Sequence, residues 1–355
     1  MPFELASILR KNILQLTPYS SARHEFTGEA KVFLDANENS MGSPIGETYH
    51  RYPDPGQEKL KAKISGLKHI PAEQIFLGNG SDEAIDLLFR MFCKPGDDQV
   101  VVCQPTYGMY AVSAAIHDVK TLNVPLTNEF QLDLGAIKST CKGSEKLLFI
   151  CSPNNPSGNA FRREDISDLL HWFKGIVVID EAYIDFSSQP SWLEELDNFP
   201  NLVVLQTFSK AWGLAGLRLG MAFGSVELIE VMMKVKAPYN LSAVVQEMAL
   251  KALALSGQVE EKVNLLLHER EKLLVALAGL PNVIKVYPSD ANFVLVRFND
   301  ARKVYSQLLN EGIVVRDRSM VSLCEDCLRI TIGSQEENKL LLASLQKGIN
   351  MNAEK

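Results

Sequence analysis

The sequence predicts an α/β protein with two parts: a large part built on a mostly parallel central sheet covered by helices, and a smaller α+β part. Three observations lead to this prediction. Short apolar runs alternate with segments of helical period over residues 74–223, which is typical of a parallel sheet clothed by helices. A long helical stretch at about 246–277 is followed by a second set of strands and helices. With 355 residues, 46% of them apolar, the chain is long enough for two or three domains.

The elements of the large part follow each other along the chain. Apolar runs that predict strands stand at 74–80, 99–105, 146–153, 175–183, 201–210 and 217–224, and helical segments stand at 82–93 and 163–173. The smaller part has predicted strands at 283–288, 291–298, 313–317 and 327–333, with helices at 301–312 and 337–349. We expect a large ligand-binding domain at 41–270, a small C-terminal domain at 271–355, and a contribution of residues 1–40 to the small domain. The alternative for the N-terminal helix is packing against the large domain. The ligand crevice is expected between the two domains.

Composition excludes several classes of protein. The 36 basic and 43 acidic residues give a net charge of −7 without a dense Lys/Arg cluster, so a nucleic-acid partner is not expected. Because no apolar run approaches the ~18 residues of a membrane span, no membrane association is expected either. The amphipathic start without a small-residue cleavage site predicts a cytoplasmic protein.

The six cysteines do not predict a metal site or a disulfide framework. Most lie in or beside apolar strands, where free thiols behave as small hydrophobes. Cys324 and Cys327 form one C-x-x-C pair, but no second pair and no histidine at ligand spacing accompanies it. We therefore interpret these thiols as structural.

Polar residues stand where several predicted strands end, and open α/β sheets bind ligands at that edge. After the strands at 146–153, 175–183 and 201–210, the chain carries Asn154 and Asn155; Asp180, Glu181 and Tyr183; and Ser209 and Lys210, with Arg218 eight residues beyond the lysine. These side chains are the candidates for the chemistry of the protein.

The turn G-N-G-S-D at 78–82 leads from a strand directly into a helix. It can be an ordinary connection capped by Ser81 or Asp82. It can also bind a phosphate, because the N–H groups of Gly80, Ser81 and Asp82 would stand at the positive end of the helix dipole. The third glycine of a dinucleotide fingerprint is replaced by Glu83, and the chain has no G-x-x-x-x-G-K-[ST] motif.

Asp180 and Lys210 each have a structural and a functional interpretation. Asp180 can cap a helix, but a carboxylate at a buried strand end needs a cation or several donors, and a protonated pyridine nitrogen supplies one. Lys210 can be a solvated surface lysine. If it lies in the crevice, its amine can condense with an aldehyde, and a cation such as Arg218 would lower its pKa towards the reactive range.

A phosphate site, an arginine, an aspartate suited to a pyridinium and a reactive lysine together describe pyridoxal phosphate. The motifs S-P-N-N-P-S-G, D-E-A-Y and T-F-S-K-A-W-G-L-A-G-L-R-L-G resemble the fold-type I aminotransferases related to aspartate aminotransferase. Within them, the motifs P-Y-S-S-A-R at 18–23, R-Y-P-D-P at 51–55, P-T-Y-G-M-Y at 105–110 and C-L-R-I-T-I-G at 327–333 are similar to those of the histidinol-phosphate aminotransferase family.

The resemblance implies a role for each matching residue. Lys210 would carry the cofactor and move the proton, Asp180 would keep the ring nitrogen protonated, and Asn155 and Tyr183 would bind the phenolic oxygen. The expected phosphate ligands are Gly80, Ser81, Asp82 through its backbone, Ser209 and Arg218. Tyr107 would stack on the ring, and Tyr52 would reach the phosphate from the partner subunit, which implies a homodimer.

The same resemblance implies how substrates bind. Arg329 would take the carboxylate of glutamate in one half-reaction and the substrate phosphate in the other, and Tyr19, Tyr52, Asn155 and Arg316 would be further substrate contacts. Either arginine could instead form a surface ion pair of little energetic value. The implied reaction is amino transfer between histidinol phosphate and 2-oxoglutarate. The alternatives are an aromatic or broad-range aminotransferase, a phosphothreonine-type decarboxylase, or a cofactor-binding regulator without turnover.

Overall fold

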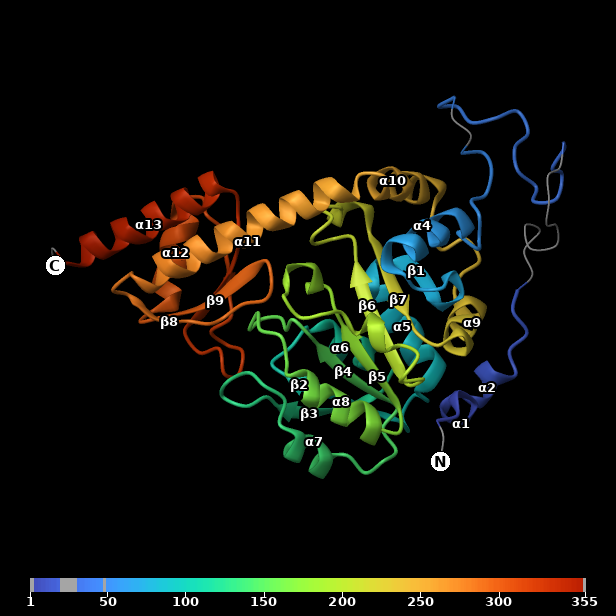
Figure 1. Cartoon of the computed structure of the whole chain (residues 1–355), viewed down its shortest axis with the longest axis horizontal. Coiled ribbons are helices and arrows are strands. Elements are labelled where there is room, and N and C mark those ends of the chain that lie inside the picture. Colours follow the sequence, from blue (N-terminus) through green and yellow to red (C-terminus); the bar gives the residue numbers. More distant parts are fainter. Residues whose placement is uncertain (1–2, 20–30, 47–48, 354–355) are drawn as a thin grey trace.

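The computed structural model describes residues 3–19, 31–46 and 49–353 and contains two sheets, as predicted (Figure 1). The large sheet has the strand order β1-β7-β6-β5-β4-β2-β3. Its strands are β1 Ile75–Asn79, β2 Gln99–Gln104, β3 Lys120–Pro125, β4 Leu147–Cys151, β5 Ile176–Asp180, β6 Leu202–Thr207 and β7 Leu219–Phe223. All neighbours pair in parallel except β7, which runs antiparallel to both β1 and β6. The predicted fold class is confirmed.

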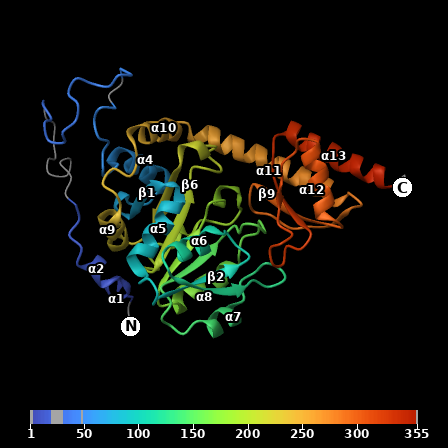
Figure 2. The same cartoon turned by 180° about the vertical axis from the view of Figure 1, so that it is seen from behind.

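Helices cover both faces of the large sheet (Figures 1 and 2). They are α4 Glu58–Lys68, α5 Gly80–Phe92, α6 Met109–Ile116, α7 Leu134–Thr140, α8 Arg163–Trp172, α9 Val226–Val235 and α10 Ala243–Leu253, with short 3-10 turns η1 Ala72–Gln74, η2 Ile184–Phe186, η3 Trp192–Glu195 and η4 Ala215–Leu217. The long helix α11 Ser256–Ala278 follows α10. Because side chains alternate along a strand, Ile75 and Leu77 join the core under α4 and α8, whereas Phe76 joins the core under α5 and α6.

The small sheet is antiparallel throughout, in the order β10-β11-β9-β8. It consists of β8 Val283–Val286, β9 Phe293–Phe298, β10 Arg316–Asp317 and β11 Cys327–Thr331, and it is covered by α12 Ala301–Asn310 and α13 Gln335–Ala353. The C-terminal half of α11 contributes Leu273 and Leu277 to the same core. The long helix α11 therefore connects the small sheet to the large one (Figure 1).

The first two helices, α1 Leu5–Ile8 and α2 Lys11–Leu14, correct one expectation. We expected residues 1–40 to contribute to the small domain, but Leu5, Leu9 and Ile13 are buried in the core that also contains α5. The N–H of Arg10 also donates to the carbonyl of Met91. The apolar side of this segment packs in the core formed by α5. Sequence periodicity shows that such a side exists but does not show which element it packs against.

Three elements differ from the predicted pattern. The helical stretch at 246–277 is divided into α10 and α11. The strand expected at 313–317 is reduced to the two residues of β10. The edge strand β3 was not predicted, because most of its side chains are only partly buried or exposed and it lacks an apolar run.

The loop after β4 contacts the loop between β8 and β9 of the small sheet. We call this contact, formed by Gly158, Ala160, Ser289 and Asp290, the seam. The N–H of Asp290 donates to the carbonyl of Gly158, and the Asp290 carboxylate accepts from the N–H of Ala160. Gly158 has φ +88°, and a Cβ there would lie 2.8 Å from Ser289 Oγ. A glycine at this position therefore lets the two segments approach closely.

Candidate active site

An open pocket of about 510 Å³ lies at the carboxyl ends of β4, β5 and β6. Its lining is Gly80, Ser81, Asp82, Tyr107, Cys151, Asn155, Asp180, Ala182, Tyr183, Thr207, Ser209, Lys210 and Arg218. Every residue predicted to contact the cofactor, except Tyr52, is among them. The structure thus brings into one pocket side chains that stand far apart in the sequence.

The turn between β1 and α5 is held against β7 by close backbone contacts. The N–H of Gly80 donates to the carbonyl of Arg218 over 2.7 Å. Gly80 has φ +71° and Arg218 has φ +55°, so both are in the left-handed region, which glycine adopts more readily. At Gly220, a Cβ would lie 2.1 Å from the N of Ser81. Glycine at 220 is therefore required for the turn to lie where it does.

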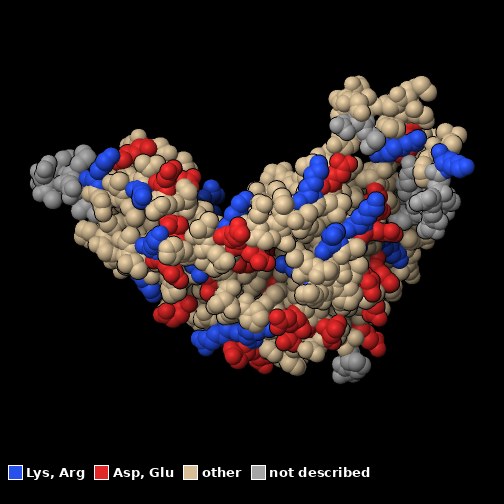
Figure 3. Space-filling view, turned by 45° about the horizontal axis from the view of Figure 1, so that its top comes forward, with Lys and Arg blue, Asp and Glu red and all other residues tan. Residues whose placement is uncertain are grey.

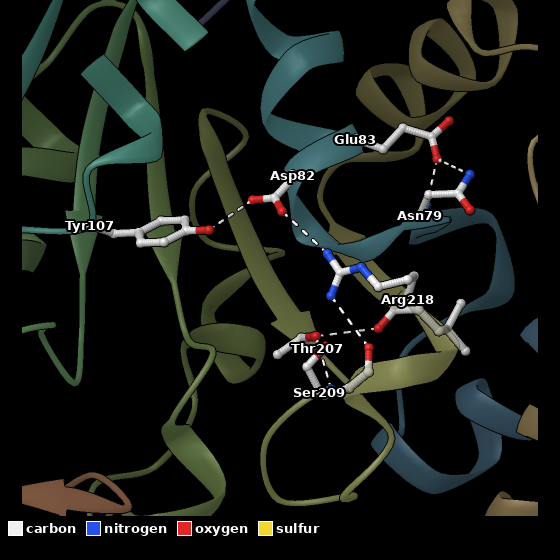
Figure 4. Close-up of polar contacts among 9 residues, drawn as sticks. Asn79, Asp82, Glu83, Tyr107, Thr207, Ser209 and Arg218 are labelled. Carbon is white, nitrogen blue, oxygen red and sulfur yellow. Dashed lines mark hydrogen bonds and ion pairs between the residues drawn. The ribbon is translucent and has the colours of Figure 1, made fainter. Parts of the chain in front are cut away.

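Charged groups converge at this turn (Figure 4). The Asp82 carboxylate accepts from Tyr107 Oη at 3.1 Å and from Arg218 Nη2 at 3.4 Å. Nearby, Thr207 Oγ1 accepts from the N–H of Ser209. The guanidinium of Arg218 and the amino end of the 13-residue helix α5 together favour an anion here. This end of the pocket fits a phosphate group.

Asp180 also lines the pocket, at the end of β5, and is only 2% exposed. Burial raises the pKa of its carboxyl group, while hydrogen bonds from Tyr110 and Ala182 act in the opposite direction. Tyr110 Oη donates to Oδ2 at 2.7 Å, and the N–H of Ala182 donates to Oδ1 at 3.1 Å. A buried carboxylate held by neutral donors is suited to a cationic partner such as a protonated ring nitrogen.

Lys210 follows β6 and points its amine at the pocket, with Nζ 5.6 Å from the centroid of the Tyr183 ring. Burial lowers the pKa of the Lys210 amine, and the charge of Arg329 lowers it further. Arg218, the cation predicted from the sequence to have this effect, also lowers the pKa of Lys210, but less than burial and Arg329 do. A lowered pKa leaves more of the amine neutral and able to react with an aldehyde.

Arg329 of the small sheet contacts Asn155, one of the residues that line the pocket. Its Nη1 donates to Oδ1 of Asn155 at 2.5 Å, and the Nδ2 of Asn155 lies 3.5 Å from Tyr183 Oη. Its guanidinium carbon stands 5.2 Å from the centroid of the Phe293 ring. Burial lowers the pKa of Arg329 and raises that of Tyr183. A cation therefore stands beside the group predicted to bind the phenolic oxygen of the cofactor.

Like Arg329, three further predicted residues do not line this pocket. Tyr52 is 51% exposed and stacks on Tyr239 with ring centroids 4.4 Å apart, and Tyr19 is 74% exposed. Arg316 is exposed on β10, directly opposite Arg329 in the strand pairing. The motif that begins at Pro18 continues through residues 20–23, which lie outside the described part of the chain.

The sequence argument missed four residues of the site: Cys151, Ala182 and Thr207, which line the pocket, and Tyr110, which binds Asp180. Cys151 and Thr207 end the strands β4 and β6, so the rule that strand ends bind ligands could have found both. Tyr110 stands three residues after Tyr107 in a motif that was quoted, but its partner is 70 positions away.

The arrangement fits pyridoxal phosphate: an anion site at one end, a buried carboxylate for the ring nitrogen, and an amine for the aldehyde. Tyr107 provides an aromatic face in the same pocket, and burial and the Asp82 charge raise the pKa of its hydroxyl. Within the described residues, no group of three or more His, Cys, Asp or Glu side chains is placed to hold a metal ion.

The chain is similar to known proteins over most of its length. Residues 26–345 match the family described as aminotransferase class I and II. A histidinol-phosphate aminotransferase of Cytophaga hutchinsonii is 51% identical over 346 residues, which cover 98% of this chain and 99% of that protein.

Two solved structures share the fold. The histidinol-phosphate aminotransferase of Clostridium acetobutylicum superimposes with a TM-score of 0.79 at 26% identity, covering 86% of this chain and 92% of the other. That of Sinorhizobium meliloti, solved in complex with pyridoxal-5'-phosphate, has a TM-score of 0.78 at 24% identity, covering 89% and 90%.

Proposed function

The chain belongs to the aminotransferase class I and II family, and from this premise we propose that it is a pyridoxal-phosphate-dependent histidinol-phosphate aminotransferase. It transfers the amino group of L-glutamate to imidazole acetol phosphate, giving 2-oxoglutarate and histidinol phosphate, a step of histidine biosynthesis. The relative that is 51% identical over nearly the full length of both chains supports this substrate assignment.

One observation carries the chemical part of the proposal: Lys210, Asp180 and the turn at Ser81 line a single pocket although they stand at the ends of three different strands of the sheet. Pyridoxal phosphate, when bound, supplies an aldehyde for the amino group and a ring that withdraws electrons from the substrate Cα. The pocket offers one group for each end of that molecule.

The protein groups have separate tasks in this proposal. Lys210 holds the cofactor and moves the proton at the substrate Cα, for which its lowered pKa is suited. Asp180 keeps the ring nitrogen protonated, and Asn155 and Tyr183 bind the phenolic oxygen. Arg218, Ser209 and the N–H groups of residues 80–82 bind the phosphate, and Tyr107 stacks on the ring.

Arg329 is the substrate-binding cation of the proposal. Its guanidinium is half-buried, and it lies beside Asn155 at the pocket. It binds the carboxylate of glutamate in one half-reaction and the phosphate of the other substrate in the second, with Tyr19, Tyr52 and Arg316 as further contacts. Charge-assisted bonds of this kind are strong and directional.

We further propose that the enzyme works as a homodimer in the cytoplasm, with Tyr52 reaching the phosphate in the partner's pocket. Support comes from Tyr52, which is half-exposed and does not line the pocket of its own chain.

Acidic and basic side chains are interspersed on the face seen in Figure 3, and the net charge is −7, so we propose no nucleic-acid partner. No helix of the described residues is long and apolar enough to cross a membrane, and we propose no membrane partner. We also propose that residues 41–270 and 271–355 form the two domains.

The test is a comparison of kcat/KM for histidinol phosphate, phenylalanine and phosphothreonine as substrates of the purified protein with 2-oxoglutarate. We expect histidinol phosphate to be preferred over phenylalanine by at least about tenfold, because a site built for a phosphate leaves its cations unpaired with a substrate that has none. Equal use of phenylalanine would instead indicate a broad-range aminotransferase. Release of carbon dioxide from phosphothreonine would indicate the decarboxylase.

A further inference from the structure

Tyr110 is a buried tyrosine of α6 to which the proposed function gives no role. Its side chain is completely buried, its ring stacks on Phe149 with centroids 4.7 Å apart, and its hydroxyl donates to Asp180 Oδ2 over 2.7 Å. We propose that Tyr110 is a positioning residue of the reaction, which fixes the orientation and the negative charge of the Asp180 carboxylate and acts on the cofactor ring through it. This inference rests on the proposed function.

The hydroxyl of Tyr110 holds the Asp180 carboxylate and is not needed for the packing of the ring. A phenylalanine would fill the same space against Phe149, and a buried hydroxyl is costly unless it finds a partner. Tyr110 Oη finds Oδ2 of Asp180, while Oδ1 accepts from the N–H of Ala182. Each carboxylate oxygen is thus held by one donor, which restricts the rotation of the group.

The charge of Asp180 depends on few neighbours. Burial raises the pKa of Asp180, and the Tyr110 hydrogen bond is the largest of the opposing effects. The titratable groups that face the carboxylate are Tyr110 of α6, Tyr107, Cys151 of β4, Tyr183, Lys210 and Asp82 of α5. Lys210 is the cation among them, and in the proposed function its amine reacts with the aldehyde of the cofactor. Removing the Tyr110 hydroxyl therefore raises the pKa of Asp180.

The test is Tyr110→Phe in the full-length enzyme, with Tyr287→Phe as the matched control. Tyr287 is also buried and packs edge-on against Phe130, outside the pocket. In Tyr110→Phe we expect kcat to fall about tenfold and the acid limb of the kcat/KM profile to move up by as much as about one pH unit, because a hydrogen bond to a charged group is lost. KM for glutamate and all values for Tyr287→Phe stay within about twofold of wild type.

A double-mutant cycle in cofactor affinity keeps the test independent of turnover. The dissociation constant of pyridoxal phosphate is measured by fluorescence quenching for the apo forms of wild type, Tyr110→Phe, Asp180→Asn and the double variant. If Tyr110 acts through Asp180, its substitution weakens binding in the wild type and has no further effect in the Asp180→Asn background. Equal effects in both backgrounds, or an unmoved acid limb with unchanged kcat, overturn the proposal. Lack of amino transfer by the wild type would remove the proposed function, yet the cycle would still decide the inference.

A second inference rests on an independent observation at the small sheet. Arg316 of β10 stands directly opposite Arg329 of β11, and like charges in that position are unfavourable. Arg318 follows two residues later, and its N–H donates to the carbonyl of Cys327. Within the described residues, none of the three guanidinium groups lies within 4.0 Å of a carboxylate. The buried Nε of Arg318 has no hydrogen-bond partner.

We infer that Arg318 is a specificity-determining residue, which adds the third positive charge needed for a phosphate dianion and is dispensable for the single charge of a carboxylate. Arg318 is close enough to Arg329, Arg316 and Tyr183 for their charges to influence its pKa, which burial and the two arginines lower. Three cations without a carboxylate partner, of which Arg318 and Arg329 are half-buried, favour a doubly charged ligand. The inference depends on the proposed function, because the α-carboxylate of glutamate carries one negative charge and the phosphate of histidinol phosphate carries two.

The experiment compares the two half-reactions of Arg318→Gln, followed separately by single-turnover absorbance. We expect kcat/KM to fall about 10- to 100-fold with histidinol phosphate and less than about threefold with glutamate, since a charge-assisted contact is lost from one substrate alone. Thermal unfolding of the free variant should occur at or above the wild-type temperature, because repulsion is relieved. The exposed Arg302→Gln on α12 serves as the control and changes neither half-reaction. An equal loss with both substrates, or no loss with either, overturns the inference.

Discussion

Arg329 of β11 donates a hydrogen bond to Asn155 in the loop after β4, although 174 positions of sequence separate the two residues. The bond joins the small sheet to the edge of the large sheet at which the cofactor groups gather. The group proposed to bind the substrate carboxylate and a group proposed to bind the cofactor are therefore directly linked.

Arg329→Gln is expected to raise KM for glutamate and to lower kcat/KM about 10- to 100-fold, because the substrate carboxylate loses a charge-assisted partner. Steady-state kinetics with glutamate at several concentrations measures this effect. Arg329→Lys keeps the charge but not the planar donor pair, so the kcat/KM of this variant for glutamate should fall between those of wild type and Arg329→Gln. A glutamine variant with the KM of the wild type would contradict the role of Arg329.

Lys210→Ala is expected to lower kcat by about 10²- to 10⁴-fold, because the general base is removed. The cofactor remains bound through Arg218 and the turn at Ser81, but the visible absorption band that depends on the lysine amine disappears. Absorbance spectra and stopped-flow kinetics test this expectation. Lys262→Ala, at an exposed position of α11, is the control. Full turnover by Lys210→Ala would refute the assignment.

Gly220→Ala tests the packing of the turn. Its Cβ would lie 2.1 Å from the N of Ser81, so the turn or β7 must shift, at an expected cost of about 1–3 kcal/mol in unfolding free energy. Cofactor affinity should fall as well, because Ser81 and Arg218 are displaced. The matched variant is Gly216→Ala, where an added Cβ meets no atom within 4 Å. Urea unfolding measures the stability of both variants, and titration measures their cofactor affinity. Equal stability and affinity of the two variants would contradict the proposed packing of the turn.

Lys61 and Lys236 predict a pH dependence of stability. Burial lowers the pKa of each amine to about 8 from 10.5, and the charge of Lys236 lowers the pKa of Lys61 further. Below pH 8 the folded chain must keep both amines charged, which costs Lys61 about 3 kcal/mol by the size of its shift. Between pH 8 and 10.5 the unfolded chain binds more protons than the folded one, so the contribution of Lys61 to unfolding free energy rises with pH.

The experiment is urea unfolding of wild type and Lys61→Met at pH 7.5 and pH 10. The variant is expected to be more stable at pH 7.5, because methionine removes a buried charge and packs beside Met233, whose Sδ lies 3.6 Å from the lysine amine. Its advantage should shrink at pH 10, where the lysine is mostly neutral. An advantage of equal size at both pH values would show that the charge is not responsible.

Sequence reasoning located residues whose position depends on local pattern. Asp180 and Lys210 each follow an apolar run, and the run predicts a buried strand whose end faces the ligand. The pocket contains both. The same reasoning found the turn at Ser81, because the glycines before a helix are visible in the sequence.

The missed features depend on contacts between distant segments or on exposure. Tyr110 acts on a residue 70 positions away, and nothing in its own motif identifies that partner. The strand β3 lies at the edge of the sheet, where alternation is weak because Lys120 and Asn123 are exposed. The amphipathic helices at Leu5 and Ile13 have a clear apolar side, but only the structure shows that α5 covers it.

The seam at Gly158 and Asp290 helps to fix the position of Arg329 relative to Lys210, because Arg329 lies in the small sheet and Lys210 follows a strand of the large one. In the proposed function, the packing of the two sheets therefore determines which distance between the anionic group and the reacting carbon of a substrate fits the site. A change in substrate size can be accommodated by altering residues of the seam, while the strands that carry the cofactor groups keep their positions.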